Sequence, residues 1–210
     1  MRVQITKIRR KLMAELDKNR YEHTLGVMYT AASLAMRYDA DIDKALLSGL
    51  LHDCAKCIPA DTKIKMCDKY HLSVSEVEKA NPSLLHAKLG AFLAAKKYHV
   101  EDRDILNAIA SHTTGHPQMT LLEKIIFIAD YIEPGREELP NMAEVRKLAF
   151  DDIDTCLYRI LEDTLIYLNS KNMPIDIMTE KTFLYYKDKL EHKHKEESHG
   201  AGKKDGADYL

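Results

Sequence analysis

The chain contains no tryptophan, and its 210 residues include only eight glycines, six prolines and four cysteines. So few turn-forming residues argue against a protein built from many short β-strands. No apolar run reaches the roughly 18 residues that a membrane-spanning helix needs, and the N-terminal residues lack the apolar segment of a secretory signal. Lys and Arg number 31 and Asp and Glu 33, so the basic excess typical of nucleic-acid-binding proteins is also missing. We therefore expect a cytoplasmic, soluble protein that binds neither membranes nor nucleic acids.

The four cysteines do not suggest a disulfide framework in a cytosolic chain of this length. Cys54 and Cys57 form a C-x-x-C pair, whereas Cys67 and Cys156 stand alone. A structural zinc site would need a second pair, and a redox dithiol would need a thioredoxin-like strand before the motif. We interpret the four residues as buried or incidental thiols, with a redox or structural-zinc role as the less favoured alternative.

Apolar residues recur at helical spacing along most of the chain. In residues 19–37, for example, Leu25, Met28 and Ala32 fall on one stripe, and residues 43–53, 83–97, 102–112, 120–132 and 153–168 repeat the pattern. Convincing alternation with a period of two appears nowhere. We therefore predict an all-α fold, a bundle of eight to ten helices around one core.

The C-terminal residues differ in composition from the rest. Residues 191–210 contain three of the eight glycines and show no apolar stripe. We predict that residues 1–190 form one domain and that residues 191–210 form a solvated, disordered tail. The histidines of this segment, His192, His194 and His199, are assigned to the tail.

Four histidines and two aspartates fall on apolar helix faces or at their ends: His23, His52, Asp53, His86, His112 and Asp130. A single histidine there is usually a hydrogen-bonded core residue. A buried ionised carboxylate, however, costs several kcal/mol unless it is paired or bound to a cation. Six such groups are difficult to satisfy with one another alone. Imidazole and carboxylate are ligands of iron, manganese and zinc, so a shared metal centre is the favoured interpretation.

The order of these residues resembles that of the HD-domain metal-dependent phosphohydrolases, with a lone His, an adjacent His-Asp pair, two spaced His and a late Asp. Within that superfamily, intermediate histidines such as His86 and His112 accompany two metal ions. Longer segments resemble the bacterial YqeK family over about residues 5–188. These segments are Arg20-Tyr21-Glu22-His23, Leu50-Leu51-His52-Asp53-Cys54-Ala55-Lys56, Leu85-His86-Ala87-Lys88-Leu89-Gly90-Ala91, His112-Thr113-Thr114-Gly115 and Ala129-Asp130-Tyr131-Ile132-Glu133-Pro134-Gly135-Arg136.

The resemblance implies an HD-domain helical bundle with a buried di-metal site that hydrolyses diadenosine tetraphosphate symmetrically to two ADP. It implies one metal ion held by His23, His52, Asp53 and Asp130, and a second held by Asp53, His86 and His112, with Asp53 bridging. Iron is the implied native metal, and manganese, cobalt or zinc could substitute. A metal-bridging hydroxide would attack phosphorus in line, so no protein nucleophile is required. The family also implies a homodimer, with the helix at 153–168 as a candidate contact.

A polyphosphate substrate needs cations beside the metal ions. Arg20 precedes His23 by three residues and shares its helix face, Lys56 follows Asp53 by three, and Arg136 follows the Glu-Pro-Gly turn. We expect Arg20, Lys56 and Arg136 to bind phosphate, and Asp53 and Lys56 to take part in catalysis. The alternative for each cation is an exposed ion pair of little energetic value.

Five further residues receive weaker or surface assignments. Thr113 is a substrate-binding candidate through its hydroxyl, although it could equally cap the helix end. Glu133 could orient a ligand or a water. His116 stands where many members of the family have Arg, and we place it near the mouth of the site. His71 and His99 are expected on the surface.

Two other functions remain open. The first is another HD phosphohydrolase, either a nucleotidase or an alarmone hydrolase. The Glu-Asp pair that usually follows His-Asp in (p)ppGpp hydrolases is missing, and so is the Gly-Tyr-Pro signature of the cyclic-dinucleotide class. The second is a non-catalytic nucleotide-sensing module. Degenerate modules usually lose metal ligands, and all six are present here.

Overall fold

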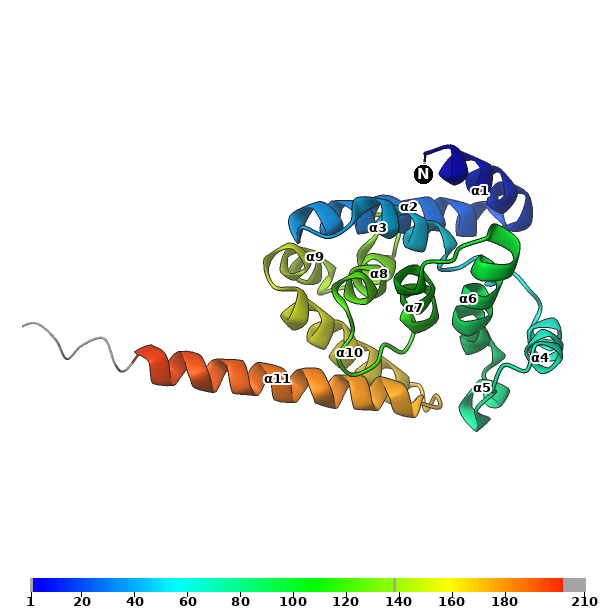
Figure 1. Cartoon of the computed structure of the whole chain (residues 1–210). Coiled ribbons are helices and arrows are strands. Elements are labelled where there is room, and N and C mark those ends of the chain that lie inside the picture. The colour runs from blue at the N-terminus through cyan, green and yellow to red at the C-terminus, as the bar shows by residue number, and fades with distance from the viewer. Residues whose placement is uncertain (1, 138, 202–210) are drawn as a thin grey trace, which may run out of the picture.

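The computed structural model describes residues 2–137 and 139–201, and over these residues the regular structure is entirely helical (Figure 1). The elements are α1 (Arg2–Glu15), α2 (Lys18–Arg37), α3 (Ile42–Leu51), α4 (Ala60–Lys69), α5 (Glu76–Ala80), the 3-10 helix η1 (Pro82–Leu84), α6 (Leu85–Tyr98), α7 (Arg103–Ser111), α8 (Leu121–Ile132), α9 (Met142–Asp151), α10 (Ile153–Ser170) and α11 (Ile177–Ala201). The predicted all-α fold is confirmed. The described residues form eleven α-helices rather than eight to ten, because elements as short as α5 leave no readable apolar period.

The centre of the bundle is formed by α2, α3 and α8. Gly49 lets α3 approach α2 closely, because a Cβ at this position would lie 2.9 Å from the Cα of Met28. Side chains without exposed surface fill the space between the three helices, among them Leu34, Leu50, Leu51, Ile125, Ile126 and Ile128. Each large apolar side chain buried in this way contributes about 1.5–3 kcal/mol. The core therefore holds α2, α3 and α8 in fixed relative positions.

Side-chain caps determine where the helices of this core begin. Asp17 accepts a hydrogen bond from the backbone N–H of Arg20 at the start of α2, and Asp41 does the same for Lys44 in α3. Thr120 and Glu123 form a capping box at the start of α8. Such caps satisfy N–H groups that have no partner within the helix. They set the register in which α2, α3 and α8 present their side chains to the interior.

The last helix, α11, extends further than the sequence composition suggested. It runs to Ala201, and its final turns project beyond the other helices (Figure 1). Lys189 pairs with Asp154 at 2.7 Å and Lys193 with Asp152 at 2.7 Å, while Leu190 is buried. Glu and Lys are also good helix formers. In the structure residues 191–201 thus continue α11, and residues 202–210 of the predicted tail lie outside the described part of the chain.

The four cysteines are free. The Cys54 thiol is buried and contacts the carbonyl oxygen of Gly90 at 3.5 Å, whereas the exposed Cys57 contacts Asp17 Oδ2 at 3.3 Å. Burial raises the pKa of Cys54 to about 12 and also raises the pKa of Cys57. Neither thiol therefore has the thiolate character of a redox-active cysteine, in agreement with the interpretation of buried or incidental thiols.

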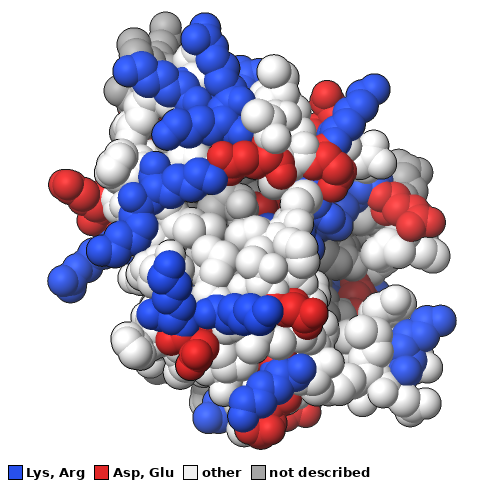
Figure 2. Space-filling view, turned by 90° about the vertical axis from the view of Figure 1, so that its right-hand side faces the viewer, with Lys and Arg blue, Asp and Glu red and all other residues white. Residues whose placement is uncertain are grey.

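Two observations concern the outer surface. Among the described residues no helix is both long and apolar enough to traverse a bilayer. On the face drawn in Figure 2, Lys and Arg side chains lie beside Asp and Glu side chains instead of forming one continuous basic stripe. The near balance of charge in the sequence is thus also visible locally on this face.

Candidate metal centre

The six predicted ligands lie together where five helices meet. His23 comes from the middle of α2, His52 ends α3 and Asp53 follows in the next turn, His86 lies in the first turn of α6, His112 ends α7 and Asp130 lies in the last turn of α8. His52, Asp53, His86 and His112 are buried, while His23 and Asp130 are partly buried at the edge.

Asp53 occupies the middle of the cluster and points one oxygen to each side. Its Oδ2 lies 3.5 Å from His52 Nε2 and 3.8 Å from His23 Nε2. Its Oδ1 lies 3.1 Å from His86 Nε2 and 3.7 Å from His112 Nε2. The single carboxylate therefore faces two separate histidine pairs.

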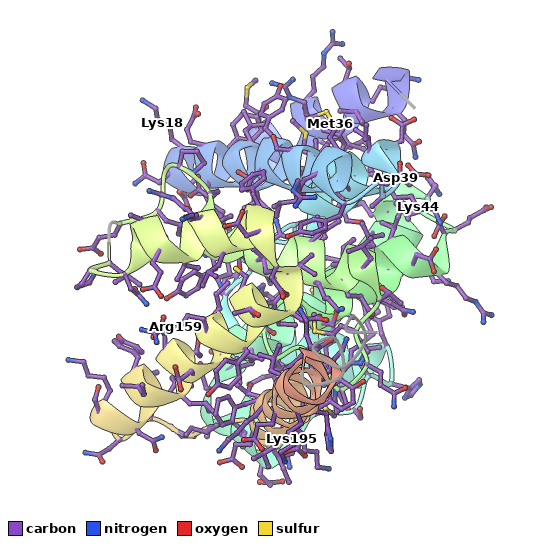
Figure 3. The ribbon with its side chains drawn as sticks, turned by 90° about the vertical axis from the view of Figure 1, so that its left-hand side faces the viewer. Lys18, Met36, Asp39, Lys44, Arg159 and Lys195 are labelled. Carbon is purple, nitrogen blue, oxygen red and sulfur yellow. The ribbon has the colours of Figure 1, made fainter. Side chains whose placement is uncertain are left out.

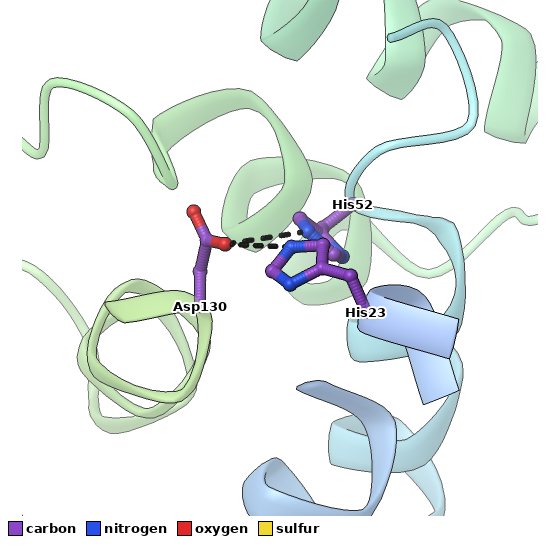
Figure 4. A group of neighbouring side chains, drawn as sticks. All are labelled: His23, His52 and Asp130. Atoms are coloured by element: carbon purple, nitrogen blue, oxygen red, sulfur yellow. Dashed lines mark ion pairs between the residues drawn. The ribbon is translucent and has the colours of Figure 1, made fainter. Parts of the chain in front are cut away.

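Asp130 joins the first of these pairs. Its Oδ1 lies 3.0 Å from His23 Nε2 and 3.7 Å from His52 Nε2, as the dashed lines in Figure 4 show. On the other side of Asp53, the Nε2 atoms of His86 and His112 are 3.0 Å apart. The cluster thus contains a group of His23, His52 and Asp130 and a group of His86 and His112, with Asp53 between them. The two groups touch, since the ring centroids of His52 and His112 are 5.0 Å apart and both residues lie with Asp53 in a second set of possible metal ligands.

Three of the four imidazoles are oriented by the carbonyl group three residues earlier. His52 Nδ1 lies 2.7 Å from Gly49 O, His112 Nδ1 lies 2.7 Å from Ile109 O, and His86 Nδ1 contacts Ser83 O. Gly49 O and Ile109 O are available because α3 and α7 end at His52 and His112, whereas Ser83 belongs to the 3-10 helix η1 that precedes α6. Since a carbonyl only accepts, Nδ1 must carry the proton, and the Nε2 lone pair points into the cluster as a metal ligand requires.

His23 is oriented differently, because in the middle of α2 the neighbouring carbonyl groups are used by the helix itself. Its Nδ1 lies 3.0 Å from Glu133 Oε1. The Glu133 carboxylate is buried and accepts a hydrogen bond of 2.6 Å from the Gly135 N–H through Oε2. A Cβ at Gly26 would overlap with this carboxylate. Glu133 therefore reaches His23 only because residue 26 lacks a side chain.

The cluster contains buried polar atoms without hydrogen-bond partners, namely His23 Nε2, His52 Nε2 and Asp53 Oδ1. Such atoms are costly and rare in folded proteins. The facing Nε2 lone pairs of His86 and His112 would also repel each other unless a proton or a cation lay between them. Cations bound among these donors would remove both penalties. The residues present therefore fit the divalent metal ions that the HD-domain resemblance implies.

The protonation states agree with this interpretation. Burial raises the pKa of Asp53, but the charge of His52 and contacts with His112 and His86 outweigh it and hold the pKa well below its usual value. Burial lowers the pKa of His86 to about 4. Burial also lowers the pKa of His52, but the negative charges of Asp53 and Asp130 prevail and raise it to about 10. Without a metal ion His52 would therefore also carry a proton on Nε2, in the place that a cation attracted by the two carboxylates would take.

The predicted cations surround the cluster. Arg20 Nη1 lies 2.6 Å from Asp53 Oδ2, and Arg136 Nη2 lies 2.5 Å from Asp130 Oδ1. Lys56 Nζ lies 3.4 Å from His86 Nε2, and burial lowers the pKa of this lysine. All three side chains are therefore within reach of a phosphate at the cluster, although phosphate binding itself remains a prediction.

Apart from Glu133, which contacts His23, the residues with weaker assignments lie away from the cluster. Thr113 lines a separate cavity of about 240 Å³ together with Glu78 and Lys88, and none of the six cluster residues lines it. His116 Nε2 lies 2.8 Å from Glu123 Oε1, so its imidazole is already engaged. His71 and His99 adopt positive φ angles of 55° and 56° just after helices. The structure therefore gives Thr113 no contact with the candidate metal centre.

Gly26 is the residue that sequence reasoning overlooked. A glycine inside a helix costs about 1 kcal/mol relative to alanine, and such a position usually has a packing or functional reason. Here the reason is the space that the Glu133 carboxylate occupies. A glycine in the middle of an otherwise regular helical pattern was the sequence signal that could have identified this position.

Comparisons with known proteins agree with this geometry. The HD domain family model matches residues 20–135, which include all six cluster residues. A protein of Bacillus subtilis named symmetrical bis(5'-nucleosyl)-tetraphosphatase is 42% identical over 172 residues, covering 82% of this chain and 90% of the relative. A protein of the same name from Staphylococcus aureus is 35% identical over 184 residues, covering 87% and 94%.

A solved structure is also similar. The crystal structure of a predicted HD superfamily hydrolase involved in NAD metabolism from Clostridium acetobutylicum superimposes with a TM-score of 0.85 at 41% identity. The match covers 88% of this chain and 97% of that chain. The chain therefore belongs to the HD domain family, and within it to the same family as these symmetrical bis(5'-nucleosyl)-tetraphosphatases.

Proposed function

We propose that this protein hydrolyses diadenosine tetraphosphate, and related dinucleoside polyphosphates, symmetrically to two nucleoside diphosphates, which are two ADP for the adenosine compound. The observation that carries the proposal is the position of Asp53: one oxygen of its carboxylate faces the pair that includes His52, and the other faces the pair that includes His86. Relatives of 35–42% identity that carry the name of this activity support the same reaction.

The protein's metal ions would be held by the cluster as the family resemblance implies. His23, His52, Asp130 and Asp53 Oδ2 would bind one ion, and His86, His112 and Asp53 Oδ1 the other. When bound, two divalent cations supply Lewis acidity toward phosphate and an activated water near neutral pH. We propose iron as the native metal, and the mixed imidazole and carboxylate donors also suit manganese, cobalt or zinc.

The remaining residues bind the substrate and stabilise charge. Arg20 and Arg136 each present a planar fork of N–H donors that matches phosphate oxygens. Both side chains reach the surface of the site, with exposed fractions of 26% and 39%. Lys56 is more deeply placed, so its ammonium group can donate to an oxygen of the phosphate that departs. Together the three cations offset the charge of a tetraphosphate chain.

Product analysis tests the proposal. The metal-loaded protein is incubated with diadenosine tetraphosphate, and the products are separated by ion-exchange chromatography. Two ADP are expected, with no product from Asp53→Ala. ATP plus AMP would contradict the symmetrical reaction, and free phosphate would indicate a nucleotidase. Tight binding of the nucleotide without any product, whatever the metal, would favour a sensing module.

We further propose a cytoplasmic homodimer. The free cysteines fit a reducing compartment. On α10, the helix that the resemblance suggests for the dimer contact, Ile166 is 63% exposed and Tyr167 is also exposed. Burial of such apolar side chains stabilises an interface between two copies. Sedimentation analysis of the wild type and of Ile166→Glu tests this, and a monomeric wild type would contradict it.

A further inference from the structure

A groove of about 740 Å³ runs along one face of α2, between this helix and the Glu133-Pro134-Gly135 turn after α8. Its α2 wall is a stripe spaced three and four residues apart: Asn19, Glu22, Gly26, Tyr29 and Ser33. Residues at this spacing share one helix face. The stripe passes His23 and continues to Ser33, so one end of the groove leads away from the candidate metal centre.

The groove is continuous with the place where phosphate is expected. His23, Glu133 and Gly135 line the groove and also line a neighbouring cavity of about 230 Å³, whose other walls include Arg20 and Arg136. Asn19 also lines both, so the two arginines adjoin the groove. A linear ligand with its phosphates beside the arginines would pass His23 and enter the groove.

The dimensions match a nucleoside. Tyr29 follows His23 by six residues, so it lies about 9 Å farther along the helix axis, at 1.5 Å per residue, and is also turned around the helix from His23, onto the stripe of Glu22 and Gly26. This is about the reach of a ribose and its base from the phosphate that carries them. A nucleoside whose phosphates lie at the metal centre would thus place its base near Tyr29.

The chemistry of the walls matches a nucleoside as well. The Tyr29 side chain is 56% exposed, so its ring is accessible to a ligand in the groove. Leu25 and Pro134 add apolar surface, and Ser33 and Glu22 offer polar groups to sugar hydroxyls or to an exocyclic amine. A single exposed aromatic residue is ordinary on a protein surface. This one stands in a groove that opens onto the phosphate site.

We infer that this groove binds one nucleoside of the substrate, with the base stacked on the Tyr29 ring. The inference rests on the proposed function for the class of ligand, a nucleotide. It adds a subsite that distinguishes nucleotides from inorganic polyphosphates, because only a nucleotide has a base that can stack. Stacking on an aromatic side chain strengthens binding about tenfold or more.

The test compares two ligands that share a diphosphate and differ in the nucleoside. Binding of ADP and of inorganic pyrophosphate to the metal-loaded protein is measured by calorimetry for the wild type, Tyr29→Ala and Tyr29→Phe. Tyr29→Ala is expected to weaken ADP binding about tenfold and to leave pyrophosphate binding unchanged. Tyr29→Phe is expected to bind ADP within about twofold of the wild type, because it retains the ring that stacks.

Met36→Ala is the matched control, since Met36 is 62% exposed on the same helix and lies beyond the groove, near the end of α2 opposite Lys18 (Figure 3). It is expected to change neither ligand. Metal content and melting temperature are measured for every variant. If Tyr29→Ala has lost metal or stability, the comparison rests on Tyr29→Phe and the wild type.

Several results would overturn the inference. These are ADP binding that is unchanged in Tyr29→Ala, equal losses for ADP and pyrophosphate, or a wild type that binds pyrophosphate as tightly as ADP. The proposed function fails separately. If diadenosine tetraphosphate is not cleaved but ADP binding depends on the Tyr29 ring, the proposed subsite is supported and the proposed reaction is wrong. If two ADP are produced but ADP affinity is the same in Tyr29→Ala and the wild type, the proposed reaction is supported and the proposed subsite is wrong.

Discussion

Glu133 Oε1 lies 3.0 Å from His23 Nδ1, although the two residues are 110 positions apart in the chain. This contact replaces, for a histidine in the middle of a helix, the backbone carbonyl groups that orient His52, His86 and His112. A carboxylate on the far nitrogen of a metal-binding imidazole fixes the ring and makes it a stronger ligand. Glu133 thus contributes to the candidate metal centre without being one of its ligands.

Glu133→Gln is expected to lower metal affinity or activity about ten- to a hundredfold, because the amide cannot supply the negative charge behind His23. Metal titration and turnover measure this, with far-UV circular dichroism to confirm the fold. Glu144→Gln, an exposed carboxylate in the first turn of α9, serves as the control. Unchanged metal affinity in Glu133→Gln would show that this contact does not tune the site.

Gly26→Ala is expected to reduce metal binding and turnover in the same way, since the new Cβ would displace the Glu133 carboxylate. Helix propensity alone predicts the opposite direction for stability, a gain of about 1 kcal/mol. Adding Gly26→Ala to Glu133→Gln should then cost little more, because both changes act on one contact. A fully active Gly26→Ala variant would refute the link between Gly26 and the Glu133 carboxylate. A double variant whose loss of metal affinity equals the sum of the two single losses would also refute it.

Asp53→Ala is expected to lose both metal ions, whereas His112→Ala should lose the ion of its own group and retain the other. The reason is that Asp53 faces both histidine pairs, while His112 belongs to one. Metal analysis of the purified variants gives the two stoichiometries. Helicity should persist in both, since the apolar core is separate from the cluster. Equal metal content in the two variants would rule out a bridging Asp53.

Arg20→Ala is expected to raise KM for diadenosine tetraphosphate about tenfold or more with metal content unchanged. A hydrogen bond from a charged group is worth about 1.5–3 kcal/mol, and Arg20 already lies 2.6 Å from Asp53 Oδ2 at the edge of the site. Lys18→Ala, at the exposed start of α2, is the control. Loss of metal in Arg20→Ala would instead assign the arginine to the stability of the cluster.

Asp154 connects three helices, because its carboxylate lies 2.6 Å from Lys124 Nζ of α8 and 2.7 Å from Lys189 Nζ of α11. Burial raises its pKa, but the two ammonium groups outweigh burial and place the pKa below the usual 3.8. The folded state therefore favours the ionised form, and the stabilisation is present above about pH 4 and is lost as the pH falls through the folded pKa.

Asp154→Asn should accordingly reduce the free energy of unfolding by about 1–2 kcal/mol at pH 7, between the values for exposed and buried ion pairs. The difference from the wild type should shrink below about pH 4, where the wild-type carboxyl also becomes neutral. Urea unfolding at pH 7, 5, 4 and 3 measures it. A difference that stays constant over this range would exclude the ion pairs as its cause.

The sequence by itself determined much of this protein. Apolar spacing predicted the all-α bundle and placed six of its helices, and the inward positions of four histidines and two aspartates pointed to one cluster. Even the orientation of His52, His86 and His112 is local, since each donates to a carbonyl three residues earlier. Composition did not indicate that α11 continues past residue 190, because the pair of Lys193 with Asp152 joins distant parts of the chain.

Other features were decided only by the tertiary structure, because they depend on contacts between helices that are remote in sequence. The division of the Asp53 oxygens between two histidine pairs requires α2, α3, α6 and α7 to meet around one turn. The contact of Glu133 with His23 requires the end of α8 to pass α2 at Gly26. The groove beside Tyr29 arises from the same passage. Helical periodicity reports which face of a helix is buried, but it does not report which other helix that face will meet.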